Sequence, residues 1–153
     1  MGIKEVKIVG EEIIYKTGLE YNETDLLSLY ENVGWKTYTK DLKKLINAFH
    51  KSLYILTAWD KDKLVGLIRV IGDGQFIIYI QDLLVAEEYQ RRGIGSNLLK
   101  KVLEKYKKVR QKILLTDNTE ETNAFYKASG FNRAEDLNLV AYVKFEEEPT
   151  KEG

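Results

Sequence analysis

The sequence predicts a mixed α/β domain with a central, largely antiparallel sheet flanked by helices. Two amphipathic stretches come early in the chain, and three runs rich in β-forming residues follow them, separated by short polar turns. The third of these runs begins a strand-helix-strand-helix order, after which a last run of strand-forming residues closes the chain. Antiparallel strands first and a β-α-β-α unit later are typical of a mixed α/β fold.

The first half of the chain contains a short initial strand, two predicted helices and three predicted strands. Each helix has one apolar stripe at helical spacing, made by Leu26, Leu29, Tyr30 and Val33 in the first and by Leu42, Leu45, Ile46 and Phe49 in the second. The runs Leu53–Trp59 and Leu64–Ile71 flank a polar turn and predict a hairpin. The turn signal Gly72-Asp73-Gly74 precedes a long third strand, Phe76–Val85.

The second half alternates helix and strand. The buried stripe of the next helix is made by Ile94, Leu98, Leu99, Val102, Leu103 and Tyr106. A short apolar strand follows at Lys112–Thr116, and then a helix at Glu120–Ser129 whose first acidic residues suit the positive end of the helix dipole. Gly130 stands where a left-handed residue commonly ends a helix, and the run Leu137–Phe145 predicts the closing strand.

Length and composition restrict the kind of protein. The 153 residues fit a single domain over 1–145, with a tail at 146–153 that contains the only proline and is expected to be frayed. Basic and acidic residues both number 24, which argues against binding nucleic acid through overall charge. There is no cysteine and only one histidine, His50, so disulfides and thiolate nucleophiles are excluded and no metal centre is expected.

The lack of long apolar segments bears on the compartment in which the protein is expected. The N-terminal residues contain no apolar run of signal-peptide length, and no stretch of the chain is long enough to span a bilayer. A cytoplasmic protein without a membrane or nucleic-acid partner is therefore expected.

The most informative segment is the loop Gln90–Ser96, which lies between a predicted strand and an amphipathic helix. Gly93 and Gly95 allow backbone conformations and close approaches that a Cβ would block, and several amide N–H groups at the helix start then face one anion. Arg91 and Arg92 add positive charge at the same place. The loop predicts a phosphate cradle, although two glycines can also make nothing more than a tight turn into a helix.

Two nucleotide-binding motifs fit this loop poorly. A Walker-type loop requires Gly-Lys-Ser/Thr, whereas Gly95 is followed by Ser96-Asn97. The dinucleotide motif requires a third small residue where this chain has Leu98, and its glycines directly after the strand. A different phosphate-containing ligand is therefore expected.

At this point the sequence resembles the GNAT (Gcn5-related N-acetyltransferase) family. Gln90-Arg91-Arg92-Gly93-Ile94-Gly95 matches the family's Q/R-x-x-G-x-G/A pyrophosphate motif, and the segment from Phe125-Tyr126 to Gly130-Phe131 matches its second motif, F/L-Y-x-x-x-G-F. The resemblance extends from about residue 12 to about residue 145. Thr119 and Thr122 depart from the asparagine and alanine that the family often has there.

The resemblance implies acetyl-CoA as co-substrate and a sheet splayed to admit the cofactor. It implies that the backbone of Leu83, Leu84 and Val85 pairs with the pantetheine amides, and that Gln90, Arg91, Arg92, Gly93, Ile94, Gly95 and Ser96 hold the pyrophosphate. Asn118 or Asn123 would replace the missing polar contact. The family also includes many dimers, so the resemblance allows a homodimer.

The implied reaction is transfer of the acetyl group to a primary amine, either a small molecule or a lysine side chain, by direct attack in a ternary complex. Tyr126 is the expected general acid for the departing sulfur, with simple aromatic packing as the alternative. Asp82 is the candidate base, or else a structurally bonded strand carboxylate. Trp35 and Tyr38 either wall the acceptor pocket or close the core. A non-catalytic acyl-CoA-binding sensor or interaction module is the alternative function.

Overall fold

A computed structural model describes residues 12–18 and 22–146. It divides the chain into two compact units, the first ending at Thr116 and the second beginning at Asp117. Of the predicted tail, residues 147–153 lie outside the described residues, so the expectation that the tail is frayed stays a prediction.

The first unit contains a five-stranded sheet with the strand order β1-β2-β3-β4-β5. Neighbouring strands are antiparallel from β1 to β4, whereas β4 and β5 are parallel. The strands are β1 (Ile14–Thr17), β2 (Tyr54–Asp60), β3 (Lys63–Gly72), β4 (Ile77–Val85) and β5 (Gln111–Leu114). The predicted mixed α/β class with a largely antiparallel sheet is confirmed, as is the hairpin of β2 and β3.

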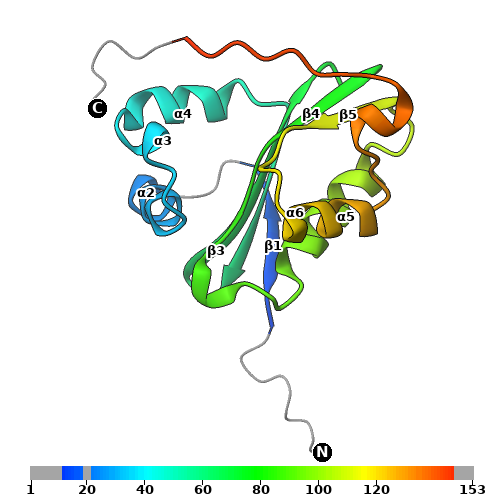
Figure 1. Cartoon of the computed structure of the whole chain (residues 1–153). Coiled ribbons are helices and arrows are strands. Elements are labelled where there is room, and N and C mark those ends of the chain that lie inside the picture. Colours follow the sequence, from blue (N-terminus) through cyan, green and yellow to red (C-terminus); the bar gives the residue numbers. More distant parts are fainter. Residues whose placement is uncertain (1–11, 19–21, 147–153) are drawn as a thin grey trace, which may run out of the picture. The chain divides into compact units, whose positions relative to one another are not determined.

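Helices cover both faces of this sheet (Figure 1). One face carries α2 (Glu23–Asn32), the short α3 (Lys36–Thr39) and α4 (Leu42–His50), and the other carries α5 (Ile94–Lys105). Asn22 caps α2 by accepting a hydrogen bond from the Asp25 amide, and Asp41 caps α4 in the same way through Lys44. The predicted helices are present, and α3 is an addition between the first two.

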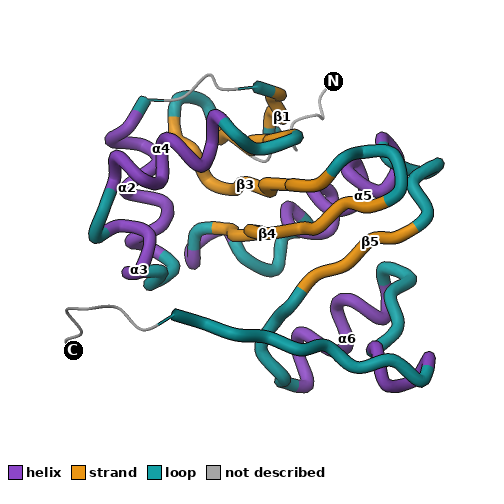
Figure 2. The backbone as a smooth tube through the Cα atoms, turned by 90° about the horizontal axis from the view of Figure 1, so that it is seen from above, coloured by secondary structure: helices purple, strands orange, loops and turns teal. Residues whose placement is uncertain are grey.

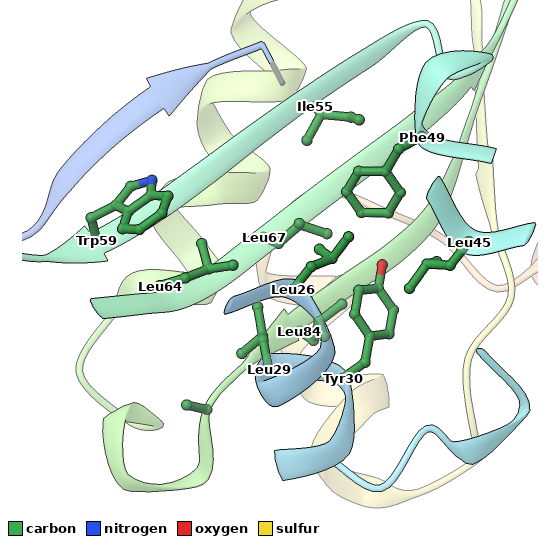
Figure 3. Close-up of a cluster of buried hydrophobic side chains, with 11 residues drawn as sticks. Leu26, Leu29, Tyr30, Leu45, Phe49, Ile55, Trp59, Leu64, Leu67 and Leu84 are labelled. Carbon is green, nitrogen blue, oxygen red and sulfur yellow. The ribbon is translucent and has the colours of Figure 1, made fainter. Parts of the chain in front are cut away.

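The core of the first unit lies between α2, α4 and the sheet (Figure 3). Its buried apolar side chains follow the predicted helical stripes and the inward face of the strands; they include Leu26, Leu29, Tyr30, Leu45, Phe49, Ile55, Trp59, Leu64, Leu67 and Leu84. On the opposite face α5 packs so closely that a Cβ at Gly66 would lie 3.2 Å from the Ile94 side chain. The first turn of α5 therefore packs closely against β3.

The sheet opens between β4 and β5. Their pairing runs only from Ile77 with Gln111 to Ile80 with Leu114, and the chain then leaves β4 (Figure 2). On its other side β4 stays paired with β3 as far as Val85, with a bulge at Gln81. The last residues of β4 consequently have a strand partner on one edge only within the described part of the first unit, which is the expected splay.

The second unit contains α6 (Glu120–Ala128) and a 3₁₀ turn, η3 (Ala134–Leu137). Gly130 has φ of 95°, as the predicted left-handed helix end requires. The predicted closing strand at Leu137–Phe145 is wrong for this structure: within residues 138–146 there is no strand. Apolar alternation creates a strand only where a neighbouring edge supplies hydrogen bonds, and here Tyr142 is 95% exposed.

Candidate functional site

The loop after β4 and the first turn of α5 form an anion-binding geometry. Gly93 is the N-cap of α5 with φ of 85°, and no side chain among the described residues caps the helix. The first hydrogen bond of the helix runs from the Asn97 amide to the Gly93 carbonyl at 2.9 Å, so helix geometry leaves the preceding amides of Ile94, Gly95 and Ser96 without an acceptor inside the helix. In the part of the chain that the structure describes, no atom lies within 4 Å of the position of a Cβ at Gly93. These features fit a pyrophosphate group.

The side chains of this loop also bind the loop itself. The Gln90 carboxamide donates to the Val85 carbonyl at 2.9 Å, which ties the loop to the end of β4. The Arg92 guanidinium donates to the Glu88 carbonyl and lies 4.8 Å from the centre of the Tyr89 ring. Arg91 has φ of 66°, and its side chain, like that of Arg92, is exposed. Arg91 and Arg92 therefore place positive charge near the N-terminus of α5, whereas Gln90 stabilises the turn that precedes the helix.

The end of β4 supplies the backbone expected to pair with an extended ligand. Leu83, Leu84 and Val85 pair with Ile68, Leu67 and Gly66 of β3, and β5 no longer accompanies them on the other edge. The Leu84 side chain is buried in the core, so the backbone at this edge is firmly held. One of its carbonyls, that of Val85, is already bonded to Gln90.

A buried ion pair lies directly before this edge. Asp82 Oδ2 accepts from Arg69 Nε at 2.7 Å and from the Tyr30 hydroxyl at 2.8 Å. Asp82 Oδ1 accepts from the Tyr38 hydroxyl at 3.0 Å. The carboxylate thus joins α2, α3, β3 and β4 through a single side chain.

The neighbours of this pair keep their protons. Burial, followed by the negative charge of Asp82, raises the pKa of Tyr30 well above its ordinary value and also raises the pKa of Tyr38. Burial acts to lower the pKa of Arg69, but the charge of Asp82 and its hydrogen bond outweigh burial and raise it. Both phenols are therefore hydrogen-bond donors to a carboxylate that a permanent cation neutralises.

Aromatic rings gather above the ion pair. Tyr30 lies edge-on to Tyr38, Trp35 and Phe49 at centroid distances of 5.3, 6.0 and 6.2 Å. Trp35 and Tyr38 are only partly buried, and their rings lie 6.0 Å apart. The Gln81 amide donates to the Tyr38 hydroxyl at 3.1 Å. The two predicted acceptor-pocket residues therefore contact the core with one side and solvent with the other.

The remaining predicted site residues belong to the second unit. Tyr126 packs edge-on against Phe125 and Phe131, and burial raises its pKa. The Asn118 side-chain oxygen accepts from Asn123 at 3.0 Å and from Arg133 at 3.1 Å, and Arg133 also donates to Asn123. Arg133 thus binds both asparagines.

The two threonines that depart from the family pattern have a local role. Thr119 is the N-cap of α6, and its side chain and that of Thr122 form a reciprocal capping box. These positions therefore stabilise the start of the helix.

Arg69 and Gln81 were not among the predicted site residues, and Tyr30 was predicted as part of an apolar helical stripe. The available signal was an arginine inside the otherwise apolar run of β3, since a buried charge requires a partner. The partner, Asp82, lies on the next strand, opposite Arg69 in the register. Gln81 gave no signal, because its position follows from the bulge.

Comparisons with known proteins agree with this geometry. A family model described as an acetyltransferase (GNAT) domain matches residues 27–146. A solved structure of a GNAT-family acetyltransferase from Streptococcus pneumoniae is 36% identical, covers 90% of this chain and all (100%) of its own, and has a TM-score of 0.80. Its strand and helix arrangement is thus the same over most of the chain.

Curated relatives are more distant or longer. A protein named GCN5-related N-acetyltransferase 2, chloroplastic, from Arabidopsis thaliana is 33% identical over 113 residues, which is 61% of this chain and 43% of that protein. An uncharacterised N-acetyltransferase, ycf52, from Pyropia yezoensis is 26% identical over 82% of this chain and 73% of its own. This chain therefore spans less than half of the plant relative. Among the described helices, none is long and apolar enough to cross a membrane.

Proposed function

Since the chain belongs to the GNAT family of acetyltransferases, we propose that it transfers the acetyl group of acetyl-CoA to a primary amine. The acceptor is a small molecule or a lysine side chain, and it attacks the thioester directly in a ternary complex. The observation that carries the proposal is the open edge of β4 that leads, through a glycine-capped turn, into α5.

This geometry suits both halves of the cofactor. Apart from the Val85 carbonyl, which accepts from Gln90, the backbone groups on the open edge at residues 83–85 can hydrogen-bond an extended chain containing amides, as an added strand would. The amides of Ile94, Gly95 and Ser96, with Arg91 and Arg92 nearby, suit the pyrophosphate through the helix dipole. The hydrogen bond from Gln90 to the Val85 carbonyl stabilises the loop that leads into this phosphate cradle. Acetyl-CoA supplies the activated acyl group when bound.

The chemistry requires a neutral amine, a carbonyl to attack and a proton for the leaving sulfur. As the new C–N bond forms and the C–S bond breaks, the amine loses one proton and the thiolate gains one. Tyr126 is the proposed donor to sulfur, because burial keeps its phenol protonated. Asn118 and Asn123 are proposed to contact the cofactor from the same unit.

Asp82 is better suited to position than to remove a proton. Its oxygens already accept three hydrogen bonds, one of them from a cation, so the carboxylate is held by the fold and is not directed at an incoming amine. We therefore assign Asp82 a structural role as a hydrogen-bonded strand carboxylate. Trp35 and Tyr38 are assigned to the wall of the pocket that binds the acceptor amine. The amine proton would leave to water.

Thermal shift with acetyl-CoA, CoA, ATP and NAD in parallel tests the cofactor. Stabilisation by the CoA species alone supports the proposal, and release of free thiol with a panel of amines then distinguishes an enzyme from an acyl-CoA-binding sensor. A sensor would show the shift without thiol release. No shift with any CoA species would remove the basis of the proposal.

A pair of glycine variants makes the test specific to the loop. Gly93→Ala and Gly18→Ala each force alanine into a left-handed conformation (φ of 85° and 94°), and no atom of the described residues lies within 4 Å of the new methyl group. Their backbone cost of about 1 kcal/mol is therefore the same. Only Gly93→Ala should abolish the shift with acetyl-CoA, and an equal loss in both variants would contradict the cradle.

A further inference from the structure

The Tyr38 hydroxyl has a fixed number of hydrogen-bonding positions. A phenol oxygen has one proton to donate and two lone pairs that accept. The proton goes to Asp82 Oδ1 at 3.0 Å, and one lone pair accepts from the Gln81 amide at 3.1 Å. In the described residues these are its two partners, so one acceptor position is left.

The direction of these bonds is imposed by the ion pair beneath. Asp82 is bonded to Arg69 at 2.7 Å and, as a carboxylate, can only accept. The Tyr38 proton must therefore point inward. Gln81 agrees with this, because an amide NH₂ donor, and not its carbonyl, is the group that fits an oxygen whose proton is already used.

The open acceptor position belongs to a partly buried side chain at the proposed reaction centre. Tyr38 lies on α3, and its hydroxyl contacts Gln81 and Asp82 of β4. The next residue, Leu83, begins the open edge of β4 that is proposed to pair with the cofactor. The ring of Trp35 lies 6.0 Å from that of Tyr38, and aromatic faces attract cations. An ammonium or amine group fits both features, whereas a carbonyl or carboxylate would meet a lone pair.

We propose that the Tyr38 hydroxyl oxygen accepts a hydrogen bond from the substrate's amine N–H, and that the buried Arg69–Asp82 pair holds it in this orientation. The proposal rests on the proposed acetyltransferase function and adds a residue that selects for donors. Tyr38 is the substrate-binding group, and Arg69 and Asp82 are positioning residues. The aromatic wall alone would not distinguish an ammonium with protons from one without.

The test compares two ligands of equal charge. The first is the primary amine with the highest turnover in the panel, and the second is its trimethylammonium analogue, which has no N–H. Calorimetric titration in the presence of CoA, which cannot acetylate either ligand, gives both dissociation constants. Their ratio in the wild type and in Tyr38→Phe isolates the contact between the hydroxyl and the N–H, since steric differences between the ligands cancel.

The expected result is a ratio that favours the primary amine by about tenfold or more in the wild type and falls by about tenfold in Tyr38→Phe. Tyr30→Phe is the matched control, because it removes another hydroxyl that donates to the Asp82 carboxylate, but one that is buried in the core. It should lower the melting temperature more than Tyr38→Phe does and shift the ratio less. A purely structural role for Tyr38 would shift both constants together.

Equal ratios in the wild type and Tyr38→Phe, with amine turnover intact, overturn this inference and leave the acetyltransferase proposal standing. A wild type that acetylates no amine overturns the proposed function, and this inference with it. The acetyl-CoA thermal shift of each variant verifies that it is folded.

Discussion

Replacing Asp82 with asparagine should destabilise the fold by about 3 kcal/mol, because it leaves the Arg69 cation buried without its counter-ion. The side chains of Arg69 and Asp82 are 6% and 0% exposed, and three donors converge on the carboxylate. An asparagine side-chain oxygen can take the place of Asp82 Oδ2, but its NH₂ group then stands where Oδ1 accepted the hydrogen bond from Tyr38. The loss stays at the lower end of the range for broken buried pairs, since Arg69 keeps its bond to Ser52 and its position over Phe49.

Urea unfolding measures this loss. With a slope of about 2 kcal/mol per molar urea, a destabilisation of about 3 kcal/mol moves the midpoint down by about 1.5 M. Glu88→Gln is the control, because the Lys63–Glu88 pair is similar in length at 2.9 Å but its side chains are 55% and 50% exposed. That variant should move the midpoint far less. Equal shifts in the two variants would refute the argument from burial.

Two further predictions concern proton positions. Tyr126→Phe should lower kcat by about 100-fold while the Kd for acetyl-CoA changes less than about twofold, because only the proton to sulfur is lost; unchanged kcat would remove Tyr126 as the acid. Lys63→Met should raise the pKa of Glu88 from about 2 toward its ordinary value in an NMR titration, because the hydrogen bond from Lys63 is the largest cause of the depression. The contribution of a depressed carboxylate to stability is present above its unfolded pKa of about 4.3 and is lost as the pH falls toward about 2, so the variant should lose less stability over that window.

Local patterns were sufficient for most elements. The apolar stripes at Leu26–Val33 and Leu42–Phe49, the turn at Gly72-Asp73-Gly74 and the left-handed Gly130 each depend on residues close in sequence. The turn into α5 is of the same kind, because Gly93 adopts the positive φ that a motif of glycines predicts. The closing strand was the exception, since its pairing depends on an edge far from it in sequence.

The sequence by itself determined the fold class, the family and the glycine-capped turn, because periodicity, turn residues and motif spacing are properties of neighbouring residues. Only the tertiary structure decided that Asp82 is clamped by Arg69, Tyr30 and Tyr38, and that β5 leaves β4 after Ile80. These groups come from elements up to 52 positions apart in the chain. Strand register and helix packing bring these groups together. Whether a carboxylate serves as a base or has a structural role depends on the hydrogen-bond donors that surround it.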